Sequence, residues 1–148
     1  MFLDLVQNQV LVAGLLAWFL GQFLKVPLEY LINHRVNWGL WFSSGGMPSS
    51  HSSLMTSVTL STGLNYGFGS PIFALAFAVS MIVVYDATGV RRQAGIHAQK
   101  INLLFEEVLR GEPLEMDKLK EVLGHTPPQV VGGVILGLLI ALLVYGVW

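Results

Sequence analysis

The feature that most constrains this chain is a long apolar run near its C-terminal end. Residues 131–148 read VGGVILGLLIALLVYGVW and contain no Asp, Glu, Lys or Arg. A helix of about 20 apolar residues crosses the roughly 30 Å hydrocarbon core of a bilayer, because an α-helix rises about 1.5 Å per residue. The run is therefore long enough, with little to spare, to be a membrane-spanning helix.

Three further segments have the composition of spans, at about residues 8–32, 50–67 and 71–89, and we place the C-terminal span at 127–148. The segment at 50–67 is rich in Ser and Thr. Their hydroxyls can bond to helix carbonyls or to neighbouring helices, so we expect this segment to be shielded from lipid. The sequence predicts an all-α integral membrane protein with a bundle of about four transmembrane helices, forming one membrane-embedded domain over 1–148.

The connection between the third and fourth spans is long and has an amphipathic pattern. Its apolar residues recur at helical spacing: Ile101, Leu104, Phe105, Val108 and Leu109. Gly111 is a helix stop signal, and a second, shorter helix is expected from about Leu114 to Leu123. The sequence predicts an amphipathic helical hairpin at about 98–123, lying on the membrane surface or capping the bundle.

Four spans would place all eight basic residues on one side of the membrane, either towards the end of a span, as for Lys25, or on a connection between spans. They are Lys25, Arg35, Arg91, Arg92, Lys100, Arg110, Lys118 and Lys120. The positive-inside rule makes that side cytoplasmic. The four histidines lie on the same side. The net charge of −1 argues against a nucleic-acid partner, and the absence of cysteine excludes disulfides.

Two helices are expected to begin on this charged side, each with a histidine at its start. In PSSH, Ser49 or Ser50 is a suitable N-cap and His51 falls in the first turn. In GHTPPQ, Thr126 is a suitable N-cap and His125 precedes it. Unpaired N–H groups and the positive end of the dipole make a helix start suitable for an anion.

A third element brings fixed charges to the same side. The stretch YDATGVRR places Asp86, Arg91 and Arg92 at the end of the third span. Two imidazoles, cations and helix starts at one membrane face suit phosphoryl transfer. One histidine can attack phosphorus, the other can protonate the leaving oxygen, and the cations stabilise the phosphate oxygens.

Three stretches taken together, GGMPSSHSS, YDATGVRRQAG and LGHTP, resemble the phosphatidic acid phosphatase type 2 and vanadium haloperoxidase superfamily. The resemblance is specifically to its small, divergent bacterial and plastid branch and covers nearly the whole chain. PSSH resembles the superfamily's Pro-Ser-Gly-His motif, with Ser50 in place of Gly. GHTPPQ and VVYDATGVRR resemble two halves of its third motif, which are separated here by the amphipathic segment.

This resemblance implies a metal-independent membrane phosphatase for lipid phosphates, without a cofactor. His125 would attack phosphorus and form a phosphohistidine, and His51 would protonate the leaving alkoxide. The implied phosphate ligands are Ser49, Ser50, Arg91 or Arg92, and, from a degenerate first motif, Lys25 and Arg35. Phosphatidic acid, phosphatidylglycerol phosphate and polyprenyl phosphates or diphosphates all stay open as substrates.

One departure from the superfamily keeps other functions open. Gln129 stands where a carboxylate would orient His125, and Asp86 is a candidate for that role from another helix. A catalytically degenerate protein that binds anionic lipids is therefore one alternative. A membrane scaffold that forms a homo-oligomer through Gly133 and Gly137 is another. No His pair has metal-ligand spacing, so we expect no metal site. The expected partners are the bilayer and a phosphorylated lipid, in a bacterial inner membrane or a plastid membrane.

Overall fold

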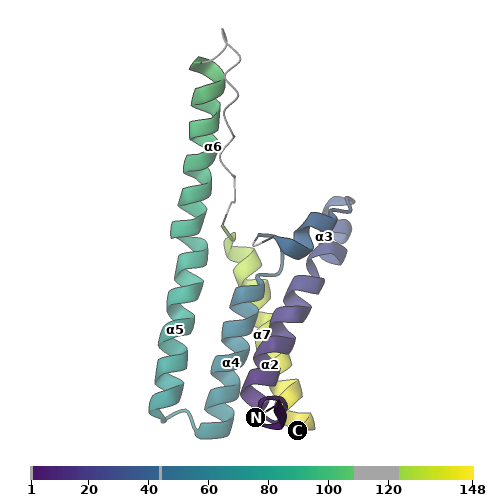
Figure 1. Cartoon of the computed structure of the whole chain (residues 1–148), viewed down its shortest axis with the longest axis vertical. Coiled ribbons are helices and arrows are strands. Elements are labelled where there is room, and N and C mark those ends of the chain that lie inside the picture. The colour runs from purple at the N-terminus through teal and green to yellow at the C-terminus, as the bar shows by residue number, and fades with distance from the viewer. Residues whose placement is uncertain (1, 44, 109–123) are drawn as a thin grey trace.

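The protein is described by a computed structural model over residues 2–43, 45–108 and 124–148, with only the backbone course given at positions 2, 91, 92 and 106–108. Within these ranges all regular structure is helical, which confirms the predicted all-α class (Figure 1). The elements are α1 (Phe2–Val6), α2 (Gln9–Phe23), α3 (Lys25–Asn33), the 3-10 helix η1 (Trp38–Phe42), α4 (Ser50–Tyr66), α5 (Pro71–Thr88), α6 (Val90–Val108) and α7 (Pro127–Val147).

Three helical stretches of the described chain are long and apolar enough to cross a membrane. They are Gln9–Asn33, which joins α2 and α3, Pro71–Phe105, which runs from α5 into α6, and Pro127–Val147. These confirm a membrane protein by length and composition. Helix α4 is not among them, because it is shorter, with 17 residues, and rich in Ser and Thr. The expected count of four spans is therefore not confirmed.

Helix α4 is nevertheless the centre of the bundle. It packs along α2, α5 and α7 (Figure 1). Its buried side chains are mostly hydroxyl-bearing: Ser50, Ser52, Ser53, Ser57, Thr59, Ser61 and Thr62. The Ser53 hydroxyl donates to the Ala17 carbonyl at 3.1 Å. The neighbouring helices therefore cover this polar helix, which is the shielded position expected from its composition.

Small residues allow the helices to approach α4 closely. A Cβ at Gly133 would collide with the Ser49 carbonyl oxygen, and one at Gly137 would lie 2.5 Å from the Ser53 carbonyl oxygen. On the opposite side, a Cβ at Gly21 would lie 3.0 Å from the Ser50 Cα. The Gly133-x-x-x-Gly137 pattern therefore serves packing within the chain, and α4 covers the face through which the scaffold alternative would dimerise.

The amphipathic segment begins earlier than its apolar pattern indicates. Helix α6 starts at Val90, directly after α5, with one interruption at Gly89, whose φ is −98° and ψ −92°. We placed the start of the hairpin at about 98. Residues 90–100 contain no proline, so nothing in them stops a helix that is already formed. The second helix of the predicted hairpin, at about 114–123, lies outside the described residues.

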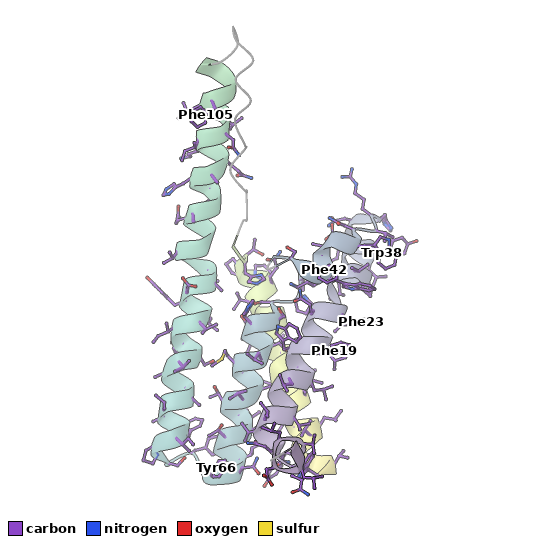
Figure 2. The ribbon with its side chains drawn as sticks, in the orientation of Figure 1. Phe19, Phe23, Trp38, Phe42, Tyr66 and Phe105 are labelled. Atoms are coloured by element: carbon purple, nitrogen blue, oxygen red, sulfur yellow. The ribbon has the colours of Figure 1, made fainter. Side chains whose placement is uncertain are left out.

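Exposed aromatic side chains lie towards the two ends of the bundle. Tyr66 lies at the end that holds both termini, whereas Trp38 and Phe42 lie at the opposite end (Figure 2). The indole N–H of Trp41 donates to the Phe23 carbonyl at 3.2 Å and its ring packs on Trp38. Aromatic residues at two levels are typical of the two membrane–water interfaces.

Candidate active site at the starts of helices α4 and α7

Three segments that are distant in the sequence meet at the end of the bundle opposite both termini (Figure 1). The backbone N–H of His125 donates to the Ala87 carbonyl at 3.0 Å, which joins the segment before α7 to the end of α5. The Ser49 N–H donates to the Gln129 carbonyl at 2.9 Å, which joins the start of α4 to the first turn of α7. Both expected helix starts are therefore fixed side by side.

The environment of His125 indicates which of its ring nitrogens carries a proton. The side chain is 3% exposed, and its Nδ1 lies 3.2 Å from Gln129 Oε1. The same Oε1 accepts the Thr126 backbone N–H at 3.1 Å, as one half of a capping box. The Thr126 N–H needs an acceptor, so the atom of the Gln129 amide that lies beside it is the oxygen. An oxygen can only accept, and His125 Nδ1 is therefore its second donor. Nδ1 therefore carries a proton, and in the neutral imidazole this arrangement puts the lone pair on Nε2.

The start of α4 is tightly built. Ser49 is the N-cap, and its hydroxyl accepts the Ser52 N–H at 3.3 Å and the Ser52 hydroxyl at 2.9 Å. Ser49 and Ser50 are fully buried, and His51 follows in the first turn with a half-buried side chain. His51 is therefore two residues from the Ser49–Gln129 contact, at the same end of the bundle as His125.

Lys25 lies against the loop that leads into α4. Its side chain is 1% exposed, and its ammonium donates to the Ser43 carbonyl at 2.7 Å. Its aliphatic stem lies beside Gly46, where an added Cβ would be 3.5 Å from the Lys25 Cδ. Gly46 has φ +89°, a conformation that favours glycine. The structure therefore holds the buried Lys25 side chain against Ser43 and Gly46 of the loop that leads into α4.

The remaining predicted site residues are placed differently. Asp86 is half-buried on α5 and immediately precedes Ala87, so it lies beside the backbone of His125. Arg91 and Arg92 lie in the first turn of α6, and the structure describes only their backbone. Arg35 is exposed in the loop between α3 and η1. Among the described contacts, none brings Arg35 to the starts of α4 and α7.

Two residues of this region were not identified from the sequence. Ala87 and Ser43 hold His125 and Lys25 through their backbone carbonyls. A carbonyl is present at every residue, so no side-chain pattern marks the ones that serve a site. Within the described residues there is no group of three or more His, Cys, Asp or Glu side chains arranged for a metal ion.

These features define a helical membrane protein that carries two histidines at adjoining helix starts at one end of its bundle. The chain belongs to the Divergent PAP2 family, whose family model matches residues 6–140. It is similar to the "Uncharacterized membrane protein YuiD" of Bacillus subtilis (strain 168), with 36% identity over 151 residues that cover 95% of this chain and 96% of the relative. No solved structure matches the chain. The resemblance stated from the three sequence stretches is thus confirmed.

Proposed function

We propose that this protein is a metal-independent phosphatase for membrane lipid phosphates, with His125 as the nucleophile. The observation that carries the proposal is the contact of His125 Nδ1 with Gln129 Oε1 at 3.2 Å, which orients the imidazole at the start of α7, beside the start of α4. His125 Nε2 attacks phosphorus while the bond from phosphorus to the lipid oxygen breaks. His51 gives its proton to the departing alkoxide, so that the lipid alcohol leaves and a phosphohistidine stays.

The second half of the reaction restores the enzyme. His51, now neutral, accepts a proton from a water molecule that attacks the phosphohistidine. The bond between phosphorus and Nε2 breaks, and inorganic phosphate is released. Lys25, the α4 start at Ser49 and Ser50, and Arg91 or Arg92 supply positive charge and N–H donors for the phosphate oxygens. Two further residues have smaller effects in this proposal. Asp86 helps to orient the site, and Arg35 helps to attract the anion.

The proposal includes a topology. Helix α4 would also cross the membrane, as the second of four spans in a single domain, because its 17 residues run beside α2 and α7 through the bundle. The site would face the cytoplasm of a bacterial cell or the corresponding side of a plastid membrane. The positive-inside rule supports this side, since the basic residues gather on the connections near the site.

One observation favours a second candidate function. Gln129 is neutral, so it orients His125 but stabilises an imidazolium less than a carboxylate does. His125 is also deeply buried. A protein that binds an anionic lipid without hydrolysing it would need Lys25 and the α4 start, but would not need Nε2 of His125.

The test is phosphate release by the purified protein in mixed micelles with EDTA present. The substrates are phosphatidic acid, phosphatidylglycerol phosphate, and undecaprenyl phosphate and diphosphate. The variants are His125→Ala and, as a matched control, His97→Ala, since His97 is exposed on α6. We expect release that is lost in His125→Ala and retained in His97→Ala. A radiolabelled phosphate that stays on the protein at alkaline pH and leaves in acid would identify the phosphohistidine.

Other outcomes decide between the candidates. Release that is equal in His125→Ala and the unaltered protein would contradict the nucleophile assignment. No release from any lipid, with binding of one of them that is lost in Lys25→Ala but not in His125→Ala, would establish the binding protein instead.

A further inference from the structure

An apolar groove of about 350 Å³ lies between α4, α5 and α7, inside the membrane-spanning part of the bundle. Helix α4 contributes Thr59 and Leu60 to its wall, α5 contributes Ser80 and Val84, and α7 contributes Leu138. The groove exists because α5 packs along α4 and has few contacts with α7. It is open to the surroundings on one side, and at this depth of a membrane the surroundings are hydrocarbon.

The groove begins close to the candidate active site. On α5, Val84 lies one helical turn before Ala87, whose carbonyl binds the His125 N–H. On α7, Val134 lines the groove five residues after Gln129. With a rise of about 1.5 Å per residue, these positions are about 5 to 8 Å from the site along the helix axes. A lipid whose phosphate is at His125 would thus have its hydrocarbon at the mouth of the groove.

Aromatic side chains close the far end of the groove. Phe68 and Phe73 meet edge to face with ring centroids 5.2 Å apart, and Phe77 is 6.1 Å from Phe73. Phe68 also packs on Gly63, where an added Cβ would lie 2.5 Å from its ring. From Val84 to Phe73 the groove extends about 16 Å along α5. That length is close to half of the roughly 30 Å hydrocarbon core, which is the depth of one leaflet.

We propose that this groove binds one acyl chain of a glycerolipid, and that Phe73 with Phe68 limits the chain to the depth of one leaflet. The placement of the lipid's phosphate at His125 depends on the proposed function, whereas the acyl-chain site depends only on the groove. The wall suits hydrocarbon, because the Thr59 hydroxyl already donates to the Ala76 carbonyl at 3.3 Å. A polyprenyl chain several times longer than the groove fits it poorly, so the groove selects phosphorylated glycerolipids from the candidate substrates.

The test is photo-cross-linking of the full chain in lipid nanodiscs, using phosphatidic acid with a diazirine near the end of one acyl chain. The groove is filled by Ser80→Trp. Its matched control is Ala78→Trp, because Ala78 is exposed on the other face of the same helix. We expect mass spectrometry to locate cross-links around Phe73 and Phe77 in the unaltered protein and in Ala78→Trp, and to find them lost in Ser80→Trp. Equal labelling in the two tryptophan variants would overturn the proposal.

A second pair keeps the test decisive if Ser80→Trp does not fold. Leu138→Trp fills the groove from α7, and Leu139→Trp places the same ring on an exposed position beside it. We expect loss of the cross-links in Leu138→Trp alone, and retention in both would also overturn the proposal. Phe73→Ala opens the far end, so the preferred chain among competing phosphatidic acids, from octanoyl to oleoyl, should shift to a longer one. An unchanged order would contradict the length limit.

Cross-linking needs no turnover, so the two proposals fail separately. If no lipid phosphate is hydrolysed but the groove cross-links persist and vanish in Ser80→Trp, the chain site stands and the phosphatase proposal fails. If phosphate is released while the cross-links do not depend on the groove, the phosphatase proposal stands and the chain site fails.

Discussion

At the scale of single residues, Gln129 accounts for most of the geometry around His125. Its side-chain oxygen binds both the Thr126 N–H and the His125 Nδ1, and its backbone carbonyl binds the Ser49 N–H. One residue therefore caps α7, sets the histidine tautomer and ties α7 to α4. A carboxylate could accept the same two N–H bonds, and the neutral amide differs from it in charge and in having an NH2 donor in place of the second oxygen.

Replacing Gln129 by Glu tests this assignment. The carboxylate should keep both hydrogen bonds and stabilise the imidazolium form of His125, so the acid limb of the pH–rate profile should move to higher pH. A hydrogen bond to a charged group is worth about 1 kcal/mol more than one between neutral groups, so kcat should rise by about fivefold to tenfold. The measurement is phosphate release against pH, with Gln129→Ala as the variant that loses the tautomer. An unshifted profile in Gln129→Glu would show that the side chain does not act through His125.

At the scale of elements, α4 is a polar helix that is stable in a bilayer because its neighbours cover it. Gly133 and Gly137 of α7 allow backbone contact on one side, and Gly21 of α2 does so on the other. Without a hydrophobic driving force between helices in lipid, such close packing is what holds them together. Small residues of α2 and α7 therefore position the start of α4, since Gly133 packs against Ser49 and Gly21 packs against Ser50.

Gly137→Ala should separate α7 from α4. The added Cβ would lie 2.5 Å from the Ser53 carbonyl oxygen, so we expect a loss of about 1–3 kcal/mol in the free energy of unfolding. Gly146→Ala is the matched control, because nothing lies within 4 Å of a Cβ there. That change should be neutral or stabilising by up to about 1 kcal/mol. Unfolding in mixed micelles measures both, and equal stability of the two variants would contradict the packing.

Two buried serines of α4 make a second comparison. Ser53→Ala removes the hydrogen bond to the Ala17 carbonyl and should lower the free energy of unfolding by about 0.6 kcal/mol, the average for such bonds between membrane helices. Ser57 is also fully buried, but among the described residues its hydroxyl has no hydrogen-bond partner. Ser57→Ala should therefore lower the free energy of unfolding by less than Ser53→Ala does. The reverse order in the same unfolding measurement would show that the hydrogen bond between α2 and α4 is unimportant.

At the scale of the whole molecule, the chain places its chemistry at one end. The starts of α4 and α7 and the end of α5 meet there, while both termini and the turn between α4 and α5 lie at the other end (Figure 1). Helix α6 continues beyond the bundle on the site's side. The charge distribution predicts that one side of the membrane carries the basic residues, and the proposed orientation makes the site end cytoplasmic.

Single cysteines can test the orientation, because the chain has none of its own. Gly69→Cys lies in the exposed turn between α4 and α5, where an added side chain meets nothing within 4 Å, and Lys100→Cys is exposed on α6. In intact cells, a membrane-impermeant thiol reagent should label Gly69→Cys, and should label Lys100→Cys after the membrane is opened. Labelling of Lys100→Cys alone in intact cells would reverse the orientation, and labelling of both would show that α5 does not cross.

The sequence by itself determined the helical membrane class, the order of the helices and the residue types at the two helix starts. These follow from local properties: hydropathy sets a span, and Ser, Thr and Pro mark where a helix begins. The first half of the amphipathic segment was also predicted, although its helix starts at Val90 instead of about 98. The extension was missed because apolar periodicity marks the face that a helix presents, not where its hydrogen bonding starts.

Only the tertiary structure decided which of these parts meet. It joined Ser49 to Gln129 and His125 to Ala87 through backbone bonds that no side chain marks. It assigned Gly133 and Gly137 to packing within the chain, where the sequence left a dimer open, and it put Arg35 in the exposed loop between α3 and η1. It also produced the groove between α4, α5 and α7. Contacts of this kind depend on how helices distant in the sequence pack, and the pattern along one helix does not contain that information.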